Sequence, residues 1–330
     1  MDTRKLGRSG IEVSALGFGC WAIGGEWQNR QGEPLGWGPV DDEVSVRAIH
    51  RALDLGITFF DTANAYGAGH SERVLGRAVA GRRDAVVLAS KWGNVVDEAT
   101  RTSADEPDLR PEHAREALTA TLGRLGTDYL DLFQLHVNQA PLSDGAALRD
   151  ACEELVAEGL IRAYGWSTDD PERARLFAEG PHCASVQVNC NVLQDAPEML
   201  ALCAELNLAA INRGPLAMGV LTGKYAAAGG LRPGDIRATP PEWLTLFRDG
   251  RVAPEWQRRF DAVRSLLTSE GRTPAQGALA WLWARSPHTV PIPGIRTVEQ
   301  AEQNAGALRF GPLTEGQLAE IEGLLGRSTP

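Results

Sequence analysis

The feature of this 330-residue sequence that most constrains its fold is a regular alternation of short apolar runs with longer stretches of helical periodicity. Eight runs have the length and composition of buried strands, at 15–20, 58–63, 86–92, 130–136, 163–168, 185–190, 208–215 and 289–295. Between them apolar residues recur at helical spacing, as at Val46, Ile49 and Leu53, before a glycine ends the pattern. This alternation predicts parallel strands joined by right-handed helical crossovers.

Eight strand–helix units close naturally into a (β/α)8 TIM barrel, and we predict this α/β fold as a single domain over residues 1–330. The alternative is an open doubly wound sheet, which would place a G-x-G-x-x-G turn at the start of the first helix. The run "GFGCWAIGG" instead continues into the loop "EWQNRQGEPLGWGPVDD" before a helix begins, which argues against the open sheet. We also predict a long loop after the seventh strand, from Ala226 to Ala253, and an extra C-terminal helix within "TEGQLAEIEGLLG".

Charge and cysteine content limit the partners and the compartment. A formal net charge of -10 argues against a nucleic-acid or anionic membrane surface, and no segment approaches the roughly 18 apolar residues of a membrane span. The five cysteines are odd in number and form no C-x-x-C pair, which is typical of reduced, buried thiols. We therefore predict a cytoplasmic protein whose partner is a small molecule rather than a nucleic acid or a membrane. The sequence has no heptad pattern from which an oligomeric state could be predicted.

Four reactive side chains stand at or just after the ends of the predicted second, third and fourth strands: Asp61, Tyr66, Lys91 and His136. Each alone also fits an ordinary structural role, but neighbouring strands lie about 4.8 Å apart, so together they should converge in one pocket. A free tyrosine has a pKa of about 10, so it is a poor proton donor near neutral pH. We expect Lys91 to lower the pKa of Tyr66, Asp61 to hold Lys91, and His136 to orient a carbonyl oxygen, which predicts an enzyme.

Ordered motifs over almost the whole chain make the sequence resemble the aldo-keto reductase family. They include "FFDTANAYGAGHSERVLGRAV", "LASKWG", "LGTDYLDLFQLH", "GLIRAYGWST", "RGPLAMGVLTGKY" and "IPGIRTVEQAEQNAGAL". The resemblance implies a barrel that binds a nicotinamide cofactor, usually NADPH, without a Rossmann fold and exchanges hydride with an aldehyde, ketone or sugar. It implies that Tyr66 is the general acid, that Lys91 and Asp61 tune it, and that His136 positions the carbonyl.

The resemblance also implies which residues bind the cofactor. They are Gly19, Cys20, Trp21, Ser167, Thr168, Gln187, Arg213, Gly214, Leu216, Lys224, Gly294, Arg296, Gln300, Gln303 and Asn304. Arg213 stands where many members have an aromatic that stacks on the nicotinamide, Thr168 where an asparagine is common, and Gln303 where an acidic residue often meets the adenine. Arg296 is assigned to the 2′-phosphate because guanidinium forks suit phosphate oxygens, so we expect NADP(H).

Trp21, Trp92 and Trp243 are expected to wall the substrate pocket, the alternative being that these tryptophans fill the core. A second function stays open: a cofactor-binding regulatory or accessory subunit with little turnover. A metal-dependent barrel hydrolase is disfavoured because the six histidines form no H-x-H or H-E-x-x-H pair, and no metal site is predicted.

Overall fold

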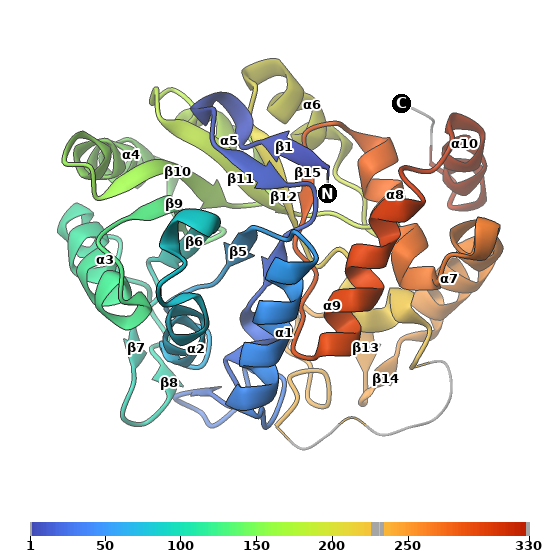
Figure 1. Ribbon diagram of the computed structural model, residues 1–330, viewed down its shortest axis with the longest axis horizontal. Helices are drawn as coiled ribbons and strands as arrows, with labels where there is room; N and C mark the ends of the chain where they lie inside the picture. Colours follow the sequence, from blue (N-terminus) through green and yellow to red (C-terminus); the bar gives the residue numbers. More distant parts are fainter. Residues whose placement is uncertain (1, 226–230, 232–233, 328–330) are drawn as a thin grey trace.

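The computed structural model describes residues 2–225, 231 and 234–327, and it has the predicted eight-stranded α/β architecture. One curved parallel sheet has the strand order β15-β12-β11-β10-β9-β6-β5-β3 (Figure 1). Its strands are β3 (Phe18–Gly19), β5 (Phe59–Asp61), β6 (Val87–Trp92), β9 (Leu130–Leu135), β10 (Ile161–Ser167), β11 (Cys183–Asn189), β12 (Ala209–Arg213) and β15 (Thr289–Pro291). Each strand falls within or overlaps one of the eight predicted runs.

Backbone hydrogen bonds join the first strand to the segment that contains the last. The amide of Gly17 donates to the carbonyl of Pro291 at 2.9 Å, and the amide of Gly19 donates to the carbonyl of Pro293 at 3.0 Å. A Cβ at Gly19 would lie 2.6 Å from the carbonyl oxygen of Ile292, so glycine is needed for this close approach. The sheet is therefore closed, which excludes the open doubly wound alternative.

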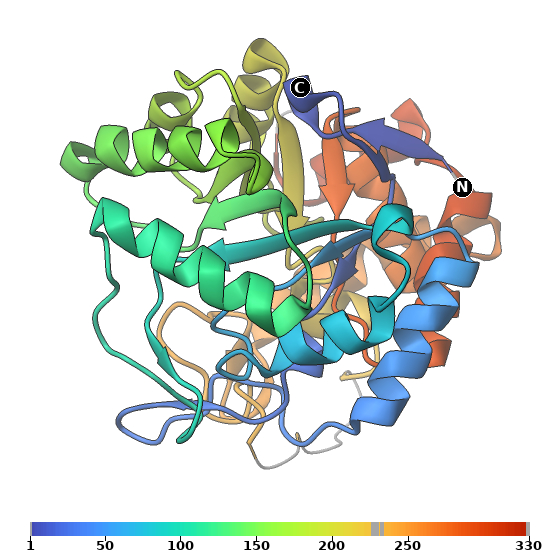
Figure 2. The same ribbon diagram turned by 60° about the vertical axis from the view of Figure 1, so that its left-hand side comes forward.

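Helices cover the outside of the barrel (Figures 1 and 2). They are α1 (Asp42–Asp54), α2 (His70–Val79), α3 (Pro111–Leu125), α4 (Leu142–Ala157), α5 (Pro171–Phe177), α6 (Pro197–Leu206), α8 (Pro274–Arg285) and α9 (Val298–Ala305). Local sequence sets their ends: the Asp41 side chain accepts hydrogen bonds from two backbone amides at the start of α1, and Gly126 ends α3 in the left-handed conformation. Among the described helices, none is both long and apolar enough to cross a membrane.

Two further helices pack beside the barrel, α7 (Pro254–Leu267) and α10 (Glu315–Leu324). Helix α10 is the predicted C-terminal helix, whereas α7 was not predicted. Of the predicted loop Ala226–Ala253, residues 226–230 and 232–233 lie outside the described residues. The described remainder contains a short hairpin of β13 (Phe247–Arg248) and β14 (Arg251–Val252).

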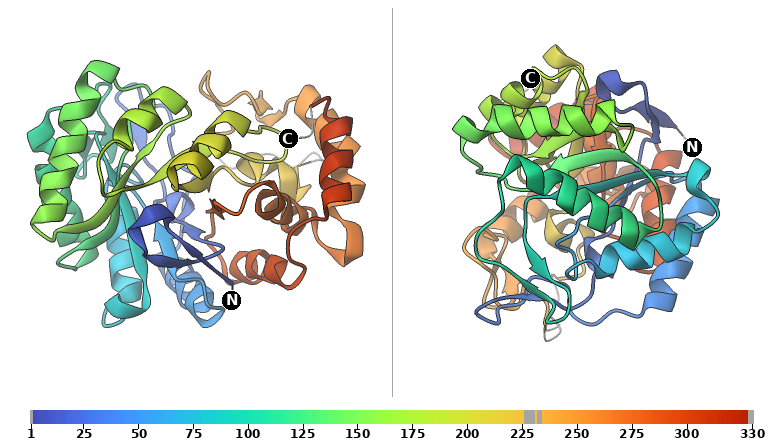
Figure 3. Two further views of the ribbon diagram at one scale, coloured as in Figure 1. Left: turned by 90° about the horizontal axis from the view of Figure 1, so that it is seen from above. Right: turned by 90° about the vertical axis from the view of Figure 1, so that its left-hand side faces the viewer.

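Different elements close the two ends of the barrel. A hairpin of β1 (Thr3–Lys5) and β2 (Glu12–Ser14) covers the end at which the strands begin. It is the dark blue segment next to the N-terminus in the left view of Figure 3. At the other end lies a small sheet of β4 (Gln28–Asn29), β7 (Val96–Asp97) and β8 (Thr102–Ser103). The 3-10 helices are Gly7–Ser9, Trp21–Ile23, Arg83–Ala85, Ala217–Thr222, Ser269–Gly271 and Gly306–Arg309.

The interior next to the N-terminal hairpin is a cluster of apolar side chains. Its members are Leu6, Ile11, Val13, Phe59, Val87, Ala89, Leu132, Ala163, Ala184, Ala209, Ile211, Val290 and Ile292. A larger apolar cluster fills the space between the strands and the surrounding helices. The barrel is thus a packed core at this end, which leaves the opposite end for polar groups.

Candidate active site

The structure brings Asp61, Tyr66, Lys91 and His136 together at the end of the barrel where the strands finish. The buried ammonium of Lys91 donates to Asp61 Oδ1 at 2.5 Å, to the carbonyl of Thr62 at 2.8 Å and to Tyr66 Oη at 3.1 Å. The rings of Tyr66 and His136 meet edge to face, with their centres 5.8 Å apart. A carboxylate, an ammonium, a phenol and an imidazole therefore form one connected group.

Strand alternation explains how these side chains reach the interior. On β5, Phe59 and Asp61 point inward, and on β6, Ala89 and Lys91 do so, because residues two apart share a face. Tyr66 is delivered by the turn after β5, where Gly67 has a φ of +64° and a Cβ would lie 2.0 Å from the carbonyl oxygen of Gly24. Only glycine permits both that conformation and that contact.

The second oxygen of Asp61 accepts hydrogen bonds from two buried amides. Nε2 of Gln134, from β9, and Nε2 of Gln187, from β11, each lie 2.9 Å from Asp61 Oδ2. Sequence reasoning missed Gln134, although a polar residue within the apolar run "LDLFQLH" was an available signal. Gln187 was predicted to bind the cofactor carboxamide; it lines the cavity, and its amide also fixes Asp61.

Burial and charge shift the pKa values of this group in different directions. Burial lowers the pKa of Lys91, but the attraction of Asp61 and the contact with Tyr66 outweigh it, so the net pKa is raised. Burial raises the pKa of Tyr66, and the ammonium of Lys91 offsets this only in part. Lys91 therefore lowers the pKa of Tyr66 as expected, but burial outweighs this effect, so the net pKa lies above its ordinary value and the phenol keeps its proton at neutral pH.

Burial, with the charges of Lys91 and Arg213, holds the pKa of His136 well below its ordinary value. A histidine with so low a pKa is a neutral imidazole near neutrality, carrying one ring proton. His136 is thus suited to hydrogen bonding rather than to carrying a positive charge.

A cavity of about 940 Å³ adjoins the four residues. Asp61, Tyr66 and His136 line it, whereas Lys91 lies behind them. The predicted cofactor and substrate residues in its wall are Gly19, Cys20, Trp21, Ser167, Gln187, Arg213, Gly214, Leu216, Lys224, Trp243, Gly294, Arg296, Gln300, Gln303 and Asn304. Nearly all the predicted positions, from segments far apart in the sequence, therefore face one space.

Two of the predicted cofactor and substrate residues do not line the cavity. Trp92 follows the inward Lys91 on β6, so its ring points outward, where it is fully buried and stacks on Phe133 with ring centres 6.1 Å apart. It is a core residue, and its assignment to the substrate pocket is wrong. Thr168 is buried, and its hydroxyl donates to the carbonyl of Asn138 at 2.9 Å instead of facing the cavity.

Arg213 and Trp243 do line the cavity but in settings that the sequence did not indicate. The guanidinium of Arg213 forms an ion pair with Asp169, which also accepts a hydrogen bond from the Asn138 amide at 3.1 Å. Trp243 is 61% exposed, so it lies at the margin of the cavity rather than in an enclosed wall.

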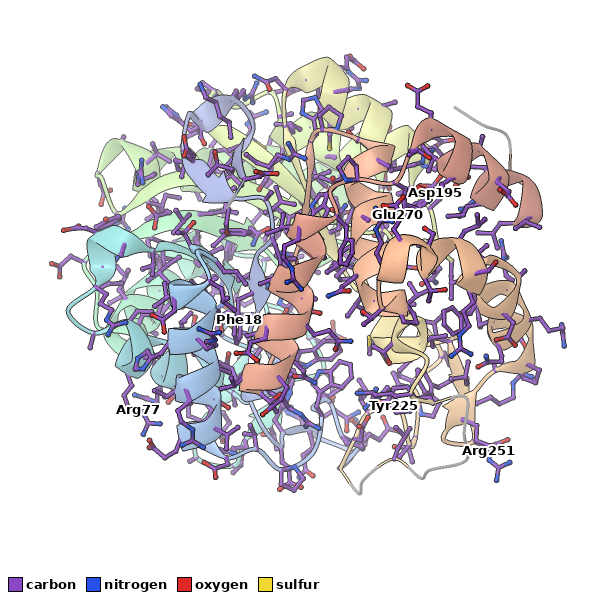
Figure 4. The ribbon with its side chains drawn as sticks, turned by 45° about the vertical axis from the view of Figure 1, so that its right-hand side comes forward. Phe18, Arg77, Asp195, Tyr225, Arg251 and Glu270 are labelled. Carbon is purple, nitrogen blue, oxygen red and sulfur yellow. The ribbon has the colours of Figure 1, made fainter. Side chains whose placement is uncertain are left out.

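The loop after β3 supplies an aromatic wall of which only Trp21 was predicted. Trp21 stacks on Tyr66 with ring centres 6.0 Å apart, and Trp37 meets Trp21 edge-on at 5.2 Å. The guanidinium of Arg237 lies 4.5 Å from the Trp37 ring and 4.7 Å from the Tyr225 ring. Figure 4 labels Tyr225 in the lower part of the molecule. A short bridge between Trp37 and Asp235 joins the two loops, whose aromatic content was visible in the sequence although their pairing was not.

The far part of the cavity fits an extended anionic dinucleotide. Gly294 lines this part and has an ordinary backbone conformation. A Cβ there would meet only the Ala22 methyl, at 3.9 Å, so the lack of a side chain leaves space in the cavity and is not required by close packing. Arg296 and Lys224 supply positive charge to this part of the cavity, and Arg296 stands just before α9. These residues fit a nicotinamide adenine dinucleotide phosphate.

Comparisons with known proteins agree with this geometry. Residues 15–325 match the model of the Aldo/keto reductase family. The chain is 30% identical to the Schizosaccharomyces pombe protein "Aldo-keto reductase yakc [NADP(+)]" over 97% of this chain and 90% of that protein. It is 33% identical to a chloroplastic pyridoxal reductase of Arabidopsis thaliana over 97% of this chain and 85% of that protein.

Solved structures give the same result. A glycerol dehydrogenase from Gluconobacter oxydans superposes with a TM-score of 0.80 at 28% identity, covering 100% of this chain and 96% of that one. An aldo/keto reductase from Klebsiella pneumoniae in complex with NADP and acetate superposes with a TM-score of 0.69 at 29% identity, covering 99% and 96%. The chain belongs to the aldo/keto reductase family.

Proposed function

We propose that this chain is an NADP(H)-dependent oxidoreductase that interconverts carbonyl compounds and alcohols, with Tyr66 as the proton donor to the carbonyl oxygen. The observation that carries the proposal is the buried Lys91, whose ammonium contacts both Asp61 and the Tyr66 hydroxyl beside a cavity of dinucleotide size. The reduced nicotinamide, when bound, supplies the hydride. The substrate is a small molecule, an aldehyde, ketone or sugar.

The pKa shifts support a separate role for each residue. Tyr66 holds its proton at neutral pH, so it is ready to act as an acid, and its phenolate is stabilised after transfer by the ammonium 3.1 Å away. Asp61, fixed by two amides, keeps that ammonium charged and in place. Neutral His136 orients the carbonyl, and the wall formed by Trp21 and Trp37 excludes water. In the oxidative direction the Tyr66 phenolate accepts the alcohol proton.

Replacing Tyr66 by phenylalanine tests the proposal. Because a positioned general acid contributes about 10² to 10⁴ in rate, Tyr66→Phe should lower kcat/KM by this factor in a carbonyl screen followed by NADPH absorbance. Tyr129→Phe is the matched control, since Tyr129 does not line the cavity and its ring, stacked under Arg83, is retained. Unchanged turnover in Tyr66→Phe would remove the assigned acid, and NADPH binding without any turnover in the parent protein would instead favour an accessory subunit.

The choice of cofactor is tested at Arg296. We infer NADP(H) because this guanidinium lines the cavity at the start of α9, and because one relative is named for NADP(+) and a similar structure contains NADP. Arg296→Ala should raise the KM for NADPH by about tenfold or more while leaving that for NADH unchanged, because a charge-assisted bond to phosphate contributes roughly 1.5 to 3 kcal/mol. Equal effects on both cofactors would assign the 2′-phosphate to another residue.

Pyridoxal and glycerol, which the names of two relatives mention, belong in the first substrate screen. We further infer that residues 1–330 act as one domain in a reducing, cytoplasmic compartment, since all five cysteines are buried free thiols.

A further inference from the structure

Asn94, in the turn directly after β6, faces the imidazole of His136 and lines the cavity. Its Nδ2 lies 3.1 Å from His136 Nδ1 and 3.5 Å from the backbone carbonyl oxygen of His136. The turn is held in place because the carbonyl of Asn94 accepts a hydrogen bond from the buried Asn64 amide at 2.8 Å. Asn94 is therefore a fixed neighbour of the ring.

The position of the amide decides which ring nitrogen carries the proton. A backbone carbonyl oxygen only accepts hydrogen bonds, so the amide group must turn its nitrogen, not its oxygen, toward His136. Facing an N–H donor, His136 Nδ1 must present its lone pair. Since His136 is neutral, its one ring proton is then on Nε2.

We propose that Asn94 is a positioning residue that fixes the Nε2-protonated tautomer of His136, so that the ring donates a hydrogen bond from Nε2 to the substrate carbonyl. The charged and titratable groups that face this ring are Lys91 from β6, Arg213 from β12 and the phenol of Tyr66. The hydrogen bonds of the two cations go elsewhere, those of Lys91 to Asp61, Thr62 and Tyr66 and that of Arg213 to Asp169, so Asn94 is the donor that faces Nδ1. The role of the hydrogen bond rests on the proposed function, whereas the tautomer is a property of the protein alone.

Nitrogen-15 NMR of the histidine side chains measures the tautomer without any turnover. The His136 signals are assigned by their loss in His136→Gln, and the parent protein should show Nδ1 unprotonated and Nε2 protonated at neutral pH. In Asn94→Asp, a carboxylate of nearly the same size only accepts, so the proton should move to Nδ1. A protonated Nδ1 in the neutral ring of the parent protein overturns the proposal, even if neither variant folds.

Kinetics test the consequence for catalysis. Asn94→Asp should lower kcat by about 10²-fold at neutral pH, the usual effect of losing one donor to a developing oxyanion, with the KM for NADPH unchanged. Activity should then recover as the pH falls, because an imidazolium ion carries protons on both nitrogens and regains the Nε2 donor. The exposed Asn207, at the end of α6, gives the matched control Asn207→Asp, which should retain parent kcat.

The outcomes separate the two proposals. A loss in Asn94→Asp that is independent of pH indicates a merely structural role and overturns the inference. Absence of turnover in the parent protein with every carbonyl overturns the proposed function, while the NMR measurement still decides whether Asn94 sets the tautomer.

Discussion

The two ends of the barrel use the same strands for opposite purposes. On β5 the inward Phe59 belongs to the apolar cluster and Asp61, two residues later, belongs to the polar group; on β9 the same change separates Leu132 from Gln134. The strands supply identical geometry at both ends, so chemistry depends only on which inward position is polar. Along each of these strands, one inward residue stabilises the fold, and the inward residue two positions later helps to hold the proton donor in place.

Burial destabilises the charged side chains at one end of the barrel and stabilises the apolar side chains at the other. Lys91 and Asp61 are 0% and 1% exposed, and removing such charges from water costs several kcal/mol per ion, which their mutual attraction offsets only if every hydrogen bond is made. Each apolar side chain buried at the other end contributes about 1.5 to 3 kcal/mol. The free energy gained by burying apolar side chains at one end therefore offsets the cost of burying charges at the other.

Breaking the ion pair should give the largest effect. Lys91→Met leaves Asp61 buried without its cation, so we expect a loss of about 3 to 5 kcal/mol in the free energy of unfolding together with loss of turnover. The double variant Lys91→Met/Asp61→Asn removes both charges and should recover most of that stability without recovering activity. Denaturant unfolding and NADPH oxidation measure the two quantities, and a double variant as unstable as the single one would show that the pair itself stabilises the fold.

A change at the apolar end should affect stability alone. Leu132→Ala opens space in the interior cluster and should lower the free energy of unfolding by about 2 to 5 kcal/mol. Its kcat with NADPH should stay within about twofold of the parent value, because no atom of the polar group moves. Leu324→Ala, at a residue 50% exposed on α10, is the control and should cost well under half as much. A large fall in kcat for Leu132→Ala would mean that the two ends are coupled.

Gln134 lies at the boundary between the two ends. Gln134→Leu extends the apolar cluster by one position and removes one of the two amides bound to Asp61 Oδ2, a hydrogen bond to a charged group worth about 1.5 to 3 kcal/mol. We expect kcat to fall by about tenfold, because Asp61 no longer holds Lys91 firmly. Gln257→Leu removes an exposed amide–carboxylate bond to Asp261 on α7 and should change neither kcat nor stability measurably. If Gln134→Leu kept the parent activity, the hydrogen bond from Gln187 alone would be enough to hold Asp61 in place.

The same contrast explains what could be predicted from the sequence. The eight apolar runs identified the strands, because burial on both faces leaves a continuous hydrophobic signal. Lys91 was found as a charge at a strand end, but the outward direction of Trp92 followed from strand alternation and was overlooked. The raised pKa of Tyr66 depends on how deeply the fold buries the ring, and the pairing of Trp37 with Asp235 joins residues about two hundred positions apart, so neither left a local pattern.

The smallest expected effect is a pH dependence of stability from the polar end. In the unfolded chain a histidine takes up a proton below about pH 6.5, but burial, Lys91 and Arg213 keep folded His136 neutral there because its pKa is well below that value. Below about pH 6.5 the unfolded state then binds more protons than the folded state. The free energy of unfolding therefore falls as the pH falls, by at most about 1.4 kcal/mol per pH unit. His136→Gln cannot take up a proton in either state, so its free energy of unfolding should decline less than that of the parent protein between about pH 7.5 and pH 5. Urea unfolding of both proteins across this range measures the difference. Parallel curves would mean that His136 titrates in the folded protein as it does in the unfolded chain, which would contradict a neutral ring at this end of the barrel.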